Sequence, residues 1–346
     1  MIPFFRKLRK RFADNNQFIK YSRYAVGEIV LVVIGILIAL SINNWNEEKK
    51  NNIIVNSVLK QIHFELAENI KRADELALWY KEKDSLIRLI MNDKLDYRGS
   101  KGNINIAIDG YDVMTIKDNG FKNLMLMTNN VPSNLNPMLV DLKELFVTYK
   151  EEVDWSNDAI EKVAIDYSDW LNLNTTWFYK KYFGNSSKIT DEEINFYVSG
   201  NSLFKNWVMQ YYNYGFDNHY RYIMKFRYHA YEVYKEITKI LKLNKEEIDS
   251  FSFNLTDQEK QQIVGTYQKE DSTLGIINRN NKFYYNLNDG EEKEIFIINK
   301  NFYTVNREFI SGFRTFNLDE NKNVIGITIR SGNYVSEYKK IIKTKG

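Results

Sequence analysis

The chain has 346 residues, which is enough for two domains of ordinary size. It contains no cysteine, so disulfides, thiolate nucleophiles and cysteine-ligated metals are excluded. The formal net charge is +3, but residues 1–23 hold seven Lys/Arg and one Asp, a net of +6, which leaves about −3 for the remainder. Because the larger part has no basic surplus, we expect no nucleic-acid partner.

The first element is an apolar stretch, YAVGEIVLVVIGILIALSINNW, which is interrupted only by Glu28. With its flanks it reaches the roughly 20 residues that a helix needs to cross the hydrocarbon layer. Tyr24 and Trp45 stand where interfacial aromatic residues are expected, and the basic residues precede the stretch. We therefore predict a basic cytoplasmic segment over 1–23, a transmembrane helix over 24–44, and an exterior region after about residue 45.

Two other interpretations of this stretch stay open. The tripeptide Ala39-Leu40-Ser41 would suit a cleaved signal peptide, and a buried helix of a soluble core is the third reading. Gly35 and Ala39 form a small-xxx-small pair that would let two membrane helices approach closely, so they mark a homodimer contact. The plainer explanation is that Gly and Ala are common in membrane helices. We interpret Glu28 as a carboxylate that reaches toward the headgroups.

The N-terminal 50 residues, above all GEIVLVVIGILIALSINNWNE, resemble the signature of a family of uncharacterised membrane-anchored proteins of Bacteroidota-type bacteria. The resemblance implies a short cytoplasmic N-terminus, a helix retained in the bacterial inner membrane, and a mainly helical periplasmic region. It implies no known activity and supplies no catalytic residues.

Three heptad stripes follow, and each predicts a long amphipathic helix. The first comprises Val55, Leu59, Ile62, Leu66, Asn69, Ala73, Leu76, Tyr80, Lys83, Ile87 and Ile90. The second comprises Leu139, Leu142, Phe146, Tyr149, Val153, Ser156, Ile160, Val163, Tyr167 and Trp170, and it fades near Phe183. The third comprises Met209, Tyr212, Phe216, His219, Ile223, Phe226, Ala230, Val233, Ile237 and Ile240.

Helices with apolar stripes must bury them against one another, so we predict an elongated antiparallel helical bundle over 45–250. A parallel dimer stalk is the alternative for the first helix, where Asn69 could fix the register. Asn136-Pro137 resembles an N-cap followed by proline at the first helical position. Thr190 to Glu193 has the pattern of a capping box.

Near residue 250 the pattern changes to short alternating runs rich in Ile, Phe, Tyr and Thr, separated by turn signals. They predict a separable domain over 251–346 with six to eight antiparallel strands, preceded by a capping box at Thr256 and Glu259. IVGTYQ and NKFYYNL are similar to the small accessory β-sheet domain that follows some exported bacterial hydrolases, a resemblance that covers 255–342. It transfers no active site. The predicted fold class is α+β.

Few residues have the spacing of a reactive site. His219 and His229 lie about 15 Å apart along one predicted helix, so they cannot share a metal, and His63 has no evident partner. Three Ser-x-x-Lys matches lack their companion motifs, as chance would give: Ser57/Lys60, Ser202/Lys205 and Ser336/Lys339. Asp319, Asn321 and Asn323 begin like a calcium loop, but Val324 and Arg330 occupy its glycine and glutamate positions.

We therefore assign no catalytic, cofactor-binding or metal residue and expect no cofactor. The function that we predict is non-catalytic: a binding, scaffold or sensor ectodomain at the cell envelope, with an unknown envelope protein as partner. The alternative is a periplasmic enzyme whose site lies between the helical bundle and the β domain.

Overall fold

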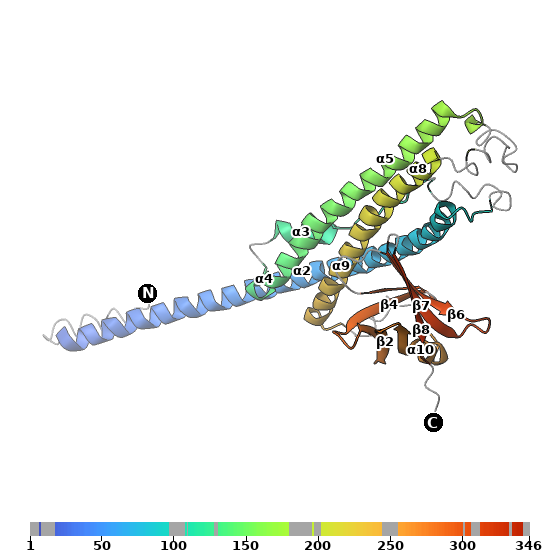
Figure 1. The fold of residues 1–346 in the computed structure, drawn as a ribbon. Coiled ribbons are helices and arrows are strands. Elements are labelled where there is room, and N and C mark those ends of the chain that lie inside the picture. Colours follow the sequence, from blue (N-terminus) through green and yellow to red (C-terminus); the bar gives the residue numbers. More distant parts are fainter. Residues whose placement is uncertain are drawn as a thin grey trace, which may run out of the picture. The chain divides into compact units, whose positions relative to one another are not determined.

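A computed structural model describes residues 7, 18–96, 108, 110–127, 131–179, 196, 202–243, 255–299, 302–305, 312–331 and 334–341. The chain divides into two compact units. One comprises Met1–Ser57 with Met127–Ser133, and the other comprises Val58–Leu126 with Asn134–Gly346. The structure is mixed helix and sheet, as predicted (Figure 1).

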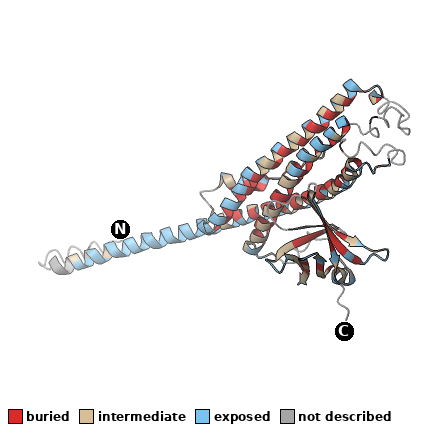
Figure 2. Ribbon diagram, in the orientation of Figure 1, coloured by how far each residue is buried: buried red, intermediate tan, exposed pale blue. Residues whose placement is uncertain are grey.

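The first long helix, α2 (Phe18–Met91), is continuous over 74 residues. Its early part is exposed, as Figure 2 shows, and the apolar side chains from Val26 to Ile42 have no neighbours that cover them. This is the one helix within the described residues that is long and apolar enough to cross a membrane. An unbroken α-helix satisfies its own backbone hydrogen bonds, which is what a hydrocarbon environment requires.

The later part of α2 carries the first heptad stripe, and the prediction is confirmed there. From Leu59 to Ile90 each predicted position is buried, including the polar Asn69 and Lys83. Lys83 is accommodated because its ammonium lies over two aromatic rings, 4.5 Å from the centroid of Trp79 and 4.9 Å from that of Tyr211.

Two further long helices run antiparallel to each other within the second unit (Figure 1). One consists of α4 (Asn136–Lys143), a π-helical segment η4 (Glu144–Tyr149) and α5 (Lys150–Asn174). The other consists of α8 (Ser202–Tyr212), a π-helical segment η5 (Asn213–Tyr220) and α9 (Arg221–Ile240). The first residues of one contact the last residues of the other, which gives the predicted antiparallel order.

The predicted stripe of the third helix is wrong at its beginning. Met209 is exposed and Tyr212 only half-buried, whereas Phe204, Val208 and Tyr211 are buried. The reason is η5, because a π-helical turn takes one residue more than an α-helical turn and so shifts the buried face by one position. Steps of four and three back from Phe216 therefore give Tyr212 and Met209, each one position after the buried Tyr211 and Val208.

Two predicted helix ends also move. The 3₁₀ turn η3 (Ser133–Leu135) precedes α4, so Leu135 is the N-cap and Asn136 already lies inside the helix. At the other end α5 stops at Asn174, earlier than predicted, because Thr175 turns to an extended conformation and its hydroxyl bonds to the carbonyl of Leu171. The capping box at 190–193 lies outside the described residues.

A small helix, α10 (Asp257–Ile263), opens the β region with the predicted capping box of Thr256 and Glu259. Among the described residues, eight strands then form a closed antiparallel barrel in which each strand pairs with its neighbours in sequence. They are β1 (Gly265–Lys269), β2 (Ser272–Arg279), β3 (Lys282–Leu287), β4 (Lys293–Asn299), β5 (Phe302–Val305), β6 (Phe313–Leu318), β7 (Val324–Ser331) and β8 (Tyr334–Lys340). Pairing of β1 with β8 closes the barrel, which removes the free strand edges.

The barrel has a core of its own, built from inward-facing residues such as Tyr267, Ile297 and Ile327. It also contacts the helices of the same unit. Phe313 belongs to the helical core, where its ring lies 4.9 Å from that of Tyr220. The described part of the barrel therefore contributes apolar surface to the bundle as well as to itself.

Candidate functional site

A buried hydrogen-bond network connects three helical segments around His219, which is fully buried. The hydroxyl of Tyr80 on α2 lies 2.5 Å from Nδ1 of this histidine, and Oδ1 of Asn157 on α5 lies 2.8 Å from its Nε2. Burial lowers the pKa of His219 to about 3, so the ring is neutral at ordinary pH. Both ring nitrogens of His219 therefore have partners within the helical core.

The contacts also assign the tautomer of His219. Oδ1 of Asn157 accepts the amide of Met114 and the Nδ2 group of Asn157 donates to the Met114 carbonyl, each at 3.0 Å, which fixes the orientation of the side-chain amide. An amide oxygen only accepts, so Nε2 of His219 carries the proton and Nδ1 accepts from Tyr80. Asn157 therefore accepts a hydrogen bond from His219 while it also binds the backbone of Met114.

We call residues 110–118 the strap, a segment outside the helices and strands in which burial alternates from Met114 to Asp118 and whose backbone the helices bind. Besides the Asn157 pair at Met114, Asn69 on α2 accepts the amide of Lys117 and donates to its carbonyl, both at 2.9 Å. In the dimer-stalk alternative Asn69 would fix the register of a helix pair; in the structure its side-chain amide binds this non-helical segment. A side-chain amide that binds both the backbone N–H and the C=O of one residue takes the place of the hydrogen bonds that a neighbouring strand would supply.

Further side chains hold the beginning of the strap. The hydroxyl of Tyr211 donates to the carbonyl of Gly110 at 3.0 Å. Arg72 donates to the carbonyl of Val113 at 3.1 Å and forms an ion pair with Asp112. Beyond the strap, α3 (Asn119–Leu126) begins, and Glu65 accepts the amide of Gly120 there at 2.9 Å.

The remaining histidines have structural partners too. His63 lies 2.8 Å from the hydroxyl of Thr238 and stacks on the ring of Tyr234 at 4.0 Å, so it connects α2 to α9. The ring of His229 lies 4.2 Å from that of Tyr149. The three histidines thus stand at three separate helix contacts.

A buried ion pair lies where the helices meet the barrel. Nε and Nη2 of Arg227 on α9 bind the two carboxylate oxygens of Asp74 on α2, at 2.9 and 3.1 Å, and the guanidinium lies 4.2 Å from the ring centroid of Phe296 on β4. Burial raises the pKa of Asp74, and the charge of Arg227 opposes that rise. Close by, the hydroxyl of Tyr231 reaches Glu294 at 3.3 Å. Arg227 and Asp74 thus neutralise each other, and Lys282 forms an ion pair with Glu294 at 3.4 Å.

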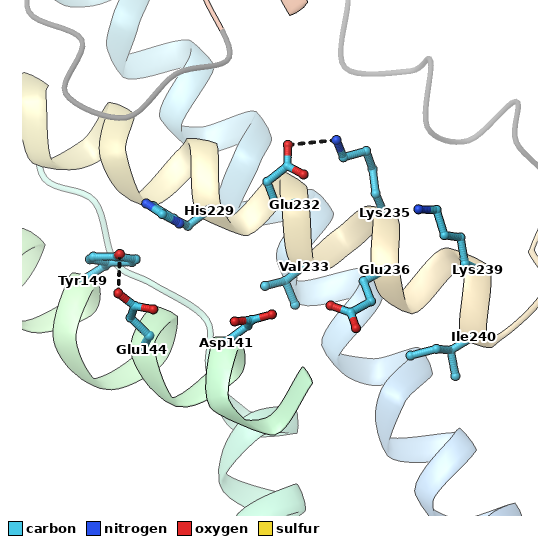
Figure 3. A pocket seen from close by; sticks show the side chains of 10 residues that line it. All are labelled: Asp141, Glu144, Tyr149, His229, Glu232, Val233, Lys235, Glu236, Lys239 and Ile240. Atoms are coloured by element: carbon cyan, nitrogen blue, oxygen red, sulfur yellow. Dashed lines mark hydrogen bonds and ion pairs between the residues drawn. The ribbon is translucent and has the colours of Figure 1, made fainter. Parts of the chain in front are cut away.

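A cavity of about 650 Å³ opens between α9 and the α4–η4 segment (Figure 3). Its charged lining residues are Asp141, Glu144, Glu232, Glu236, Lys235 and Lys239. Glu144 accepts a hydrogen bond from Tyr149 at 2.6 Å, and Glu232 pairs with Lys235 at 2.8 Å. Burial raises the pKa of Glu236, Asp141 raises it further, and Lys239 opposes the rise. The lining has more carboxylates than lysines, which suits a cationic group better than an anion.

The weaker sequence motifs receive structural explanations. In the barrel, Ser336 is buried and accepts from Lys269 at 3.0 Å, whereas Lys339 is exposed, because residues three apart in a strand face opposite sides. Asp319 accepts the amide of Asn323 at 2.7 Å, so this acidic run forms the turn between β6 and β7. Within the residues that the structure describes, no group of three or more His, Asp or Glu side chains is arranged to hold a metal.

The comparisons with known proteins are sparse. Residues 28–99 match the model of a family of unknown function (DUF6090), which is 72 of the 346 residues. The match runs through most of the apolar stretch and the helix that carries the first heptad stripe, so this region resembles an uncharacterised family, but the match begins later and extends further than the predicted 1–50. No curated protein and no solved structure matches the chain.

Proposed function

We propose that the protein is a single-pass protein of the bacterial inner membrane whose exterior region binds or scaffolds an envelope partner without catalysis. The observation that carries the proposal is the composition of α2 along its length. Its early part is apolar and exposed, and from Leu59 onward the same helix is a core element of a folded bundle. Exposed apolar surface of this size is unfavourable in water, which supports a membrane for that part.

The orientation follows from charge. The basic segment 1–23 stays in the cytoplasm, and residues after about 45 lie in the periplasm. A binding role is supported by the way the described polar side chains are used. His219, Asn157, Asn69 and Arg227 are each engaged with another part of the chain rather than directed at a cavity.

The alternative, a periplasmic enzyme with a site between the bundle and the β domain, has less support. The ionisable groups described at that contact include Asp74, Arg227 and Glu294, which are engaged in an ion pair and hydrogen bonds. General acid–base catalysis needs a titratable group within reach of a substrate.

The proposal is tested by locating the chain and its N-terminus. Alkaline phosphatase fused after Trp45 should be active and the same reporter fused after Phe18 inactive, and the intact protein in washed membranes should begin at residue 1 or 2. A mature N-terminus at Ile42, with the protein released to the periplasm, would overturn the anchor. A matched chain with an unrelated transmembrane helix in place of 24–44 should keep the same crosslinked envelope partner if the exterior region does the binding.

A further inference from the structure

We propose that the groove between α2 and α5 is a binding site for an extended peptide, and that the strap, residues 110–118, occupies this groove in cis as a releasable segment. The inference rests on the proposed binding role of the exterior region and gives that role a ligand class. It begins from the way the strap is recognised.

The helices bind the strap mainly through its backbone. Six backbone atoms of the strap are bound by four side chains, namely those of Tyr211, Arg72, Asn157 and Asn69. Main-chain hydrogen bonds to an extended segment give affinity that is independent of sequence, while pockets for alternate side chains give specificity. The groove has both parts, because Met114 and Ile116 are buried and Thr115 and Lys117 between and after them are exposed.

The groups that bind the strap stand on helical segments. Asn157 also contacts the ring of His219, which contacts Tyr80 in turn, and all three belong to helical segments. Preorganised groups on rigid elements lose less conformational freedom on binding than groups on loops. Hydrogen bonds that connect Asn157 to His219 and Tyr80 in this way suit a groove that binds a peptide.

We expect the strap to open at a lower free energy than the core helices. Its ion pair between Arg72 and Asp112 is half-exposed, with side-chain exposures of 35% and 38%, so salt weakens it. Apart from Met114 and Ile116 the described strap buries little apolar surface. Segments with few buried apolar contacts open at lower free energy than core helices.

The groove also defines its ligand. A fitting peptide has a carboxylate for Arg72, as Asp112 provides, and apolar residues two and four positions later. The partner is therefore a protein that presents an extended Asp-x-apolar-x-apolar segment.

The experiment uses the full chain in detergent and a fluorescein-labelled peptide, GYDVMTIKD, which has the sequence of residues 110–118. Replacing Met114→Pro and Lys117→Pro removes the two amides that Asn157 and Asn69 bind and so loosens the strap. The peptide should bind the loosened chain about tenfold or more tightly than the wild type, in which the tethered strap competes. Binding should vanish when Asn69→Ala and Asn157→Ala are added, and also when the peptide is N-methylated at the same two amides.

A loosened chain that keeps its helical circular dichroism but binds no peptide would overturn the proposal, as would binding that ignores the asparagines. If the proline variants do not fold, hydrogen exchange on the wild type decides. The Met114 and Lys117 amides should exchange well before the amides of the bundle core, and exchange only with global unfolding contradicts release. Failure here leaves the membrane anchor untouched, and a cleaved anchor leaves the peptide binding measurable.

Discussion

Acidification should destabilise the protein through His219, and the size of the effect follows from its burial. The ordinary pKa of a histidine is about 6.5, and burial lowers that of His219 to about 3. Between these two values the unfolded chain binds a proton that the folded chain refuses. The free energy of unfolding therefore falls as the pH falls below 6.5, and the stability that the neutral His219 contributes is fully present above that value.

The magnitude can be worked out for a convenient interval. Each unit of pKa difference corresponds to about 1.4 kcal/mol, and at pH 5 the unfolded histidine is about 1.5 units below its own midpoint. Lowering the pH from 7.5 to 5 should therefore remove about 2 kcal/mol through this one side chain. That is a large share of the stability of an ordinary domain.

The assay is urea unfolding of the full chain in detergent at pH 7.5, 6 and 5, followed by tryptophan fluorescence. The matched control is His219→Gln, whose side-chain amide can still donate toward Asn157 and accept from Tyr80 but does not titrate. Carboxylates, His63 and His229 are common to both proteins, so the difference between their pH profiles isolates His219. Wild type should lose about 2 kcal/mol more than the variant. Parallel profiles would refute the assignment of a buried neutral ring.

Two further predictions concern other contacts. Replacing Arg227→Met should lower the free energy of unfolding by about 3–5 kcal/mol because it leaves Asp74 buried and charged. The double variant with Asp74→Asn should lose clearly less stability than the two single variants lose together. If the losses of the two single variants simply add in the double variant, the pairing is contradicted. Replacing Gly35→Ile together with Ala39→Ile should abolish self-association measured by energy transfer in lipid vesicles, whereas Val33→Ile should not; a wild-type monomer would rule out the small-residue dimer.

Periodicity was a reliable guide to the fold where burial is decided locally. The stripe from Leu59 to Ile90 and the alternating runs of the barrel both reflect side chains that face a core, so the helices and strands could be predicted from spacing alone. The π-helical segment η5 could not, since Val208 and Met209 are both apolar and adjacent. Only the burial on either side of η5 reveals the shift of one residue.

The contacts of the candidate site could not be read from the sequence because they join distant residues. Asn69 and Lys117 are 48 positions apart, and Asp74 and Arg227 are 153 apart. Spacing rules describe neighbours on one helix face or one strand, and they carry no information on which polar group meets which across the fold. A weak signal existed in the strap, where Met114 and Ile116 alternate with polar residues.

The polar residues that interrupt the apolar stripes share one property that bears on function. Asn69 and His219 read in the sequence as defects in two seams, yet each is buried with its polar atoms directed at another segment of the chain. A buried polar group is costly unless it is paired, so such residues specify which partner arrangement is adopted. Both ring nitrogens of His219 are engaged with side chains of other helices. We therefore propose recognition of a peptide backbone, rather than catalysis, as the role of the bundle.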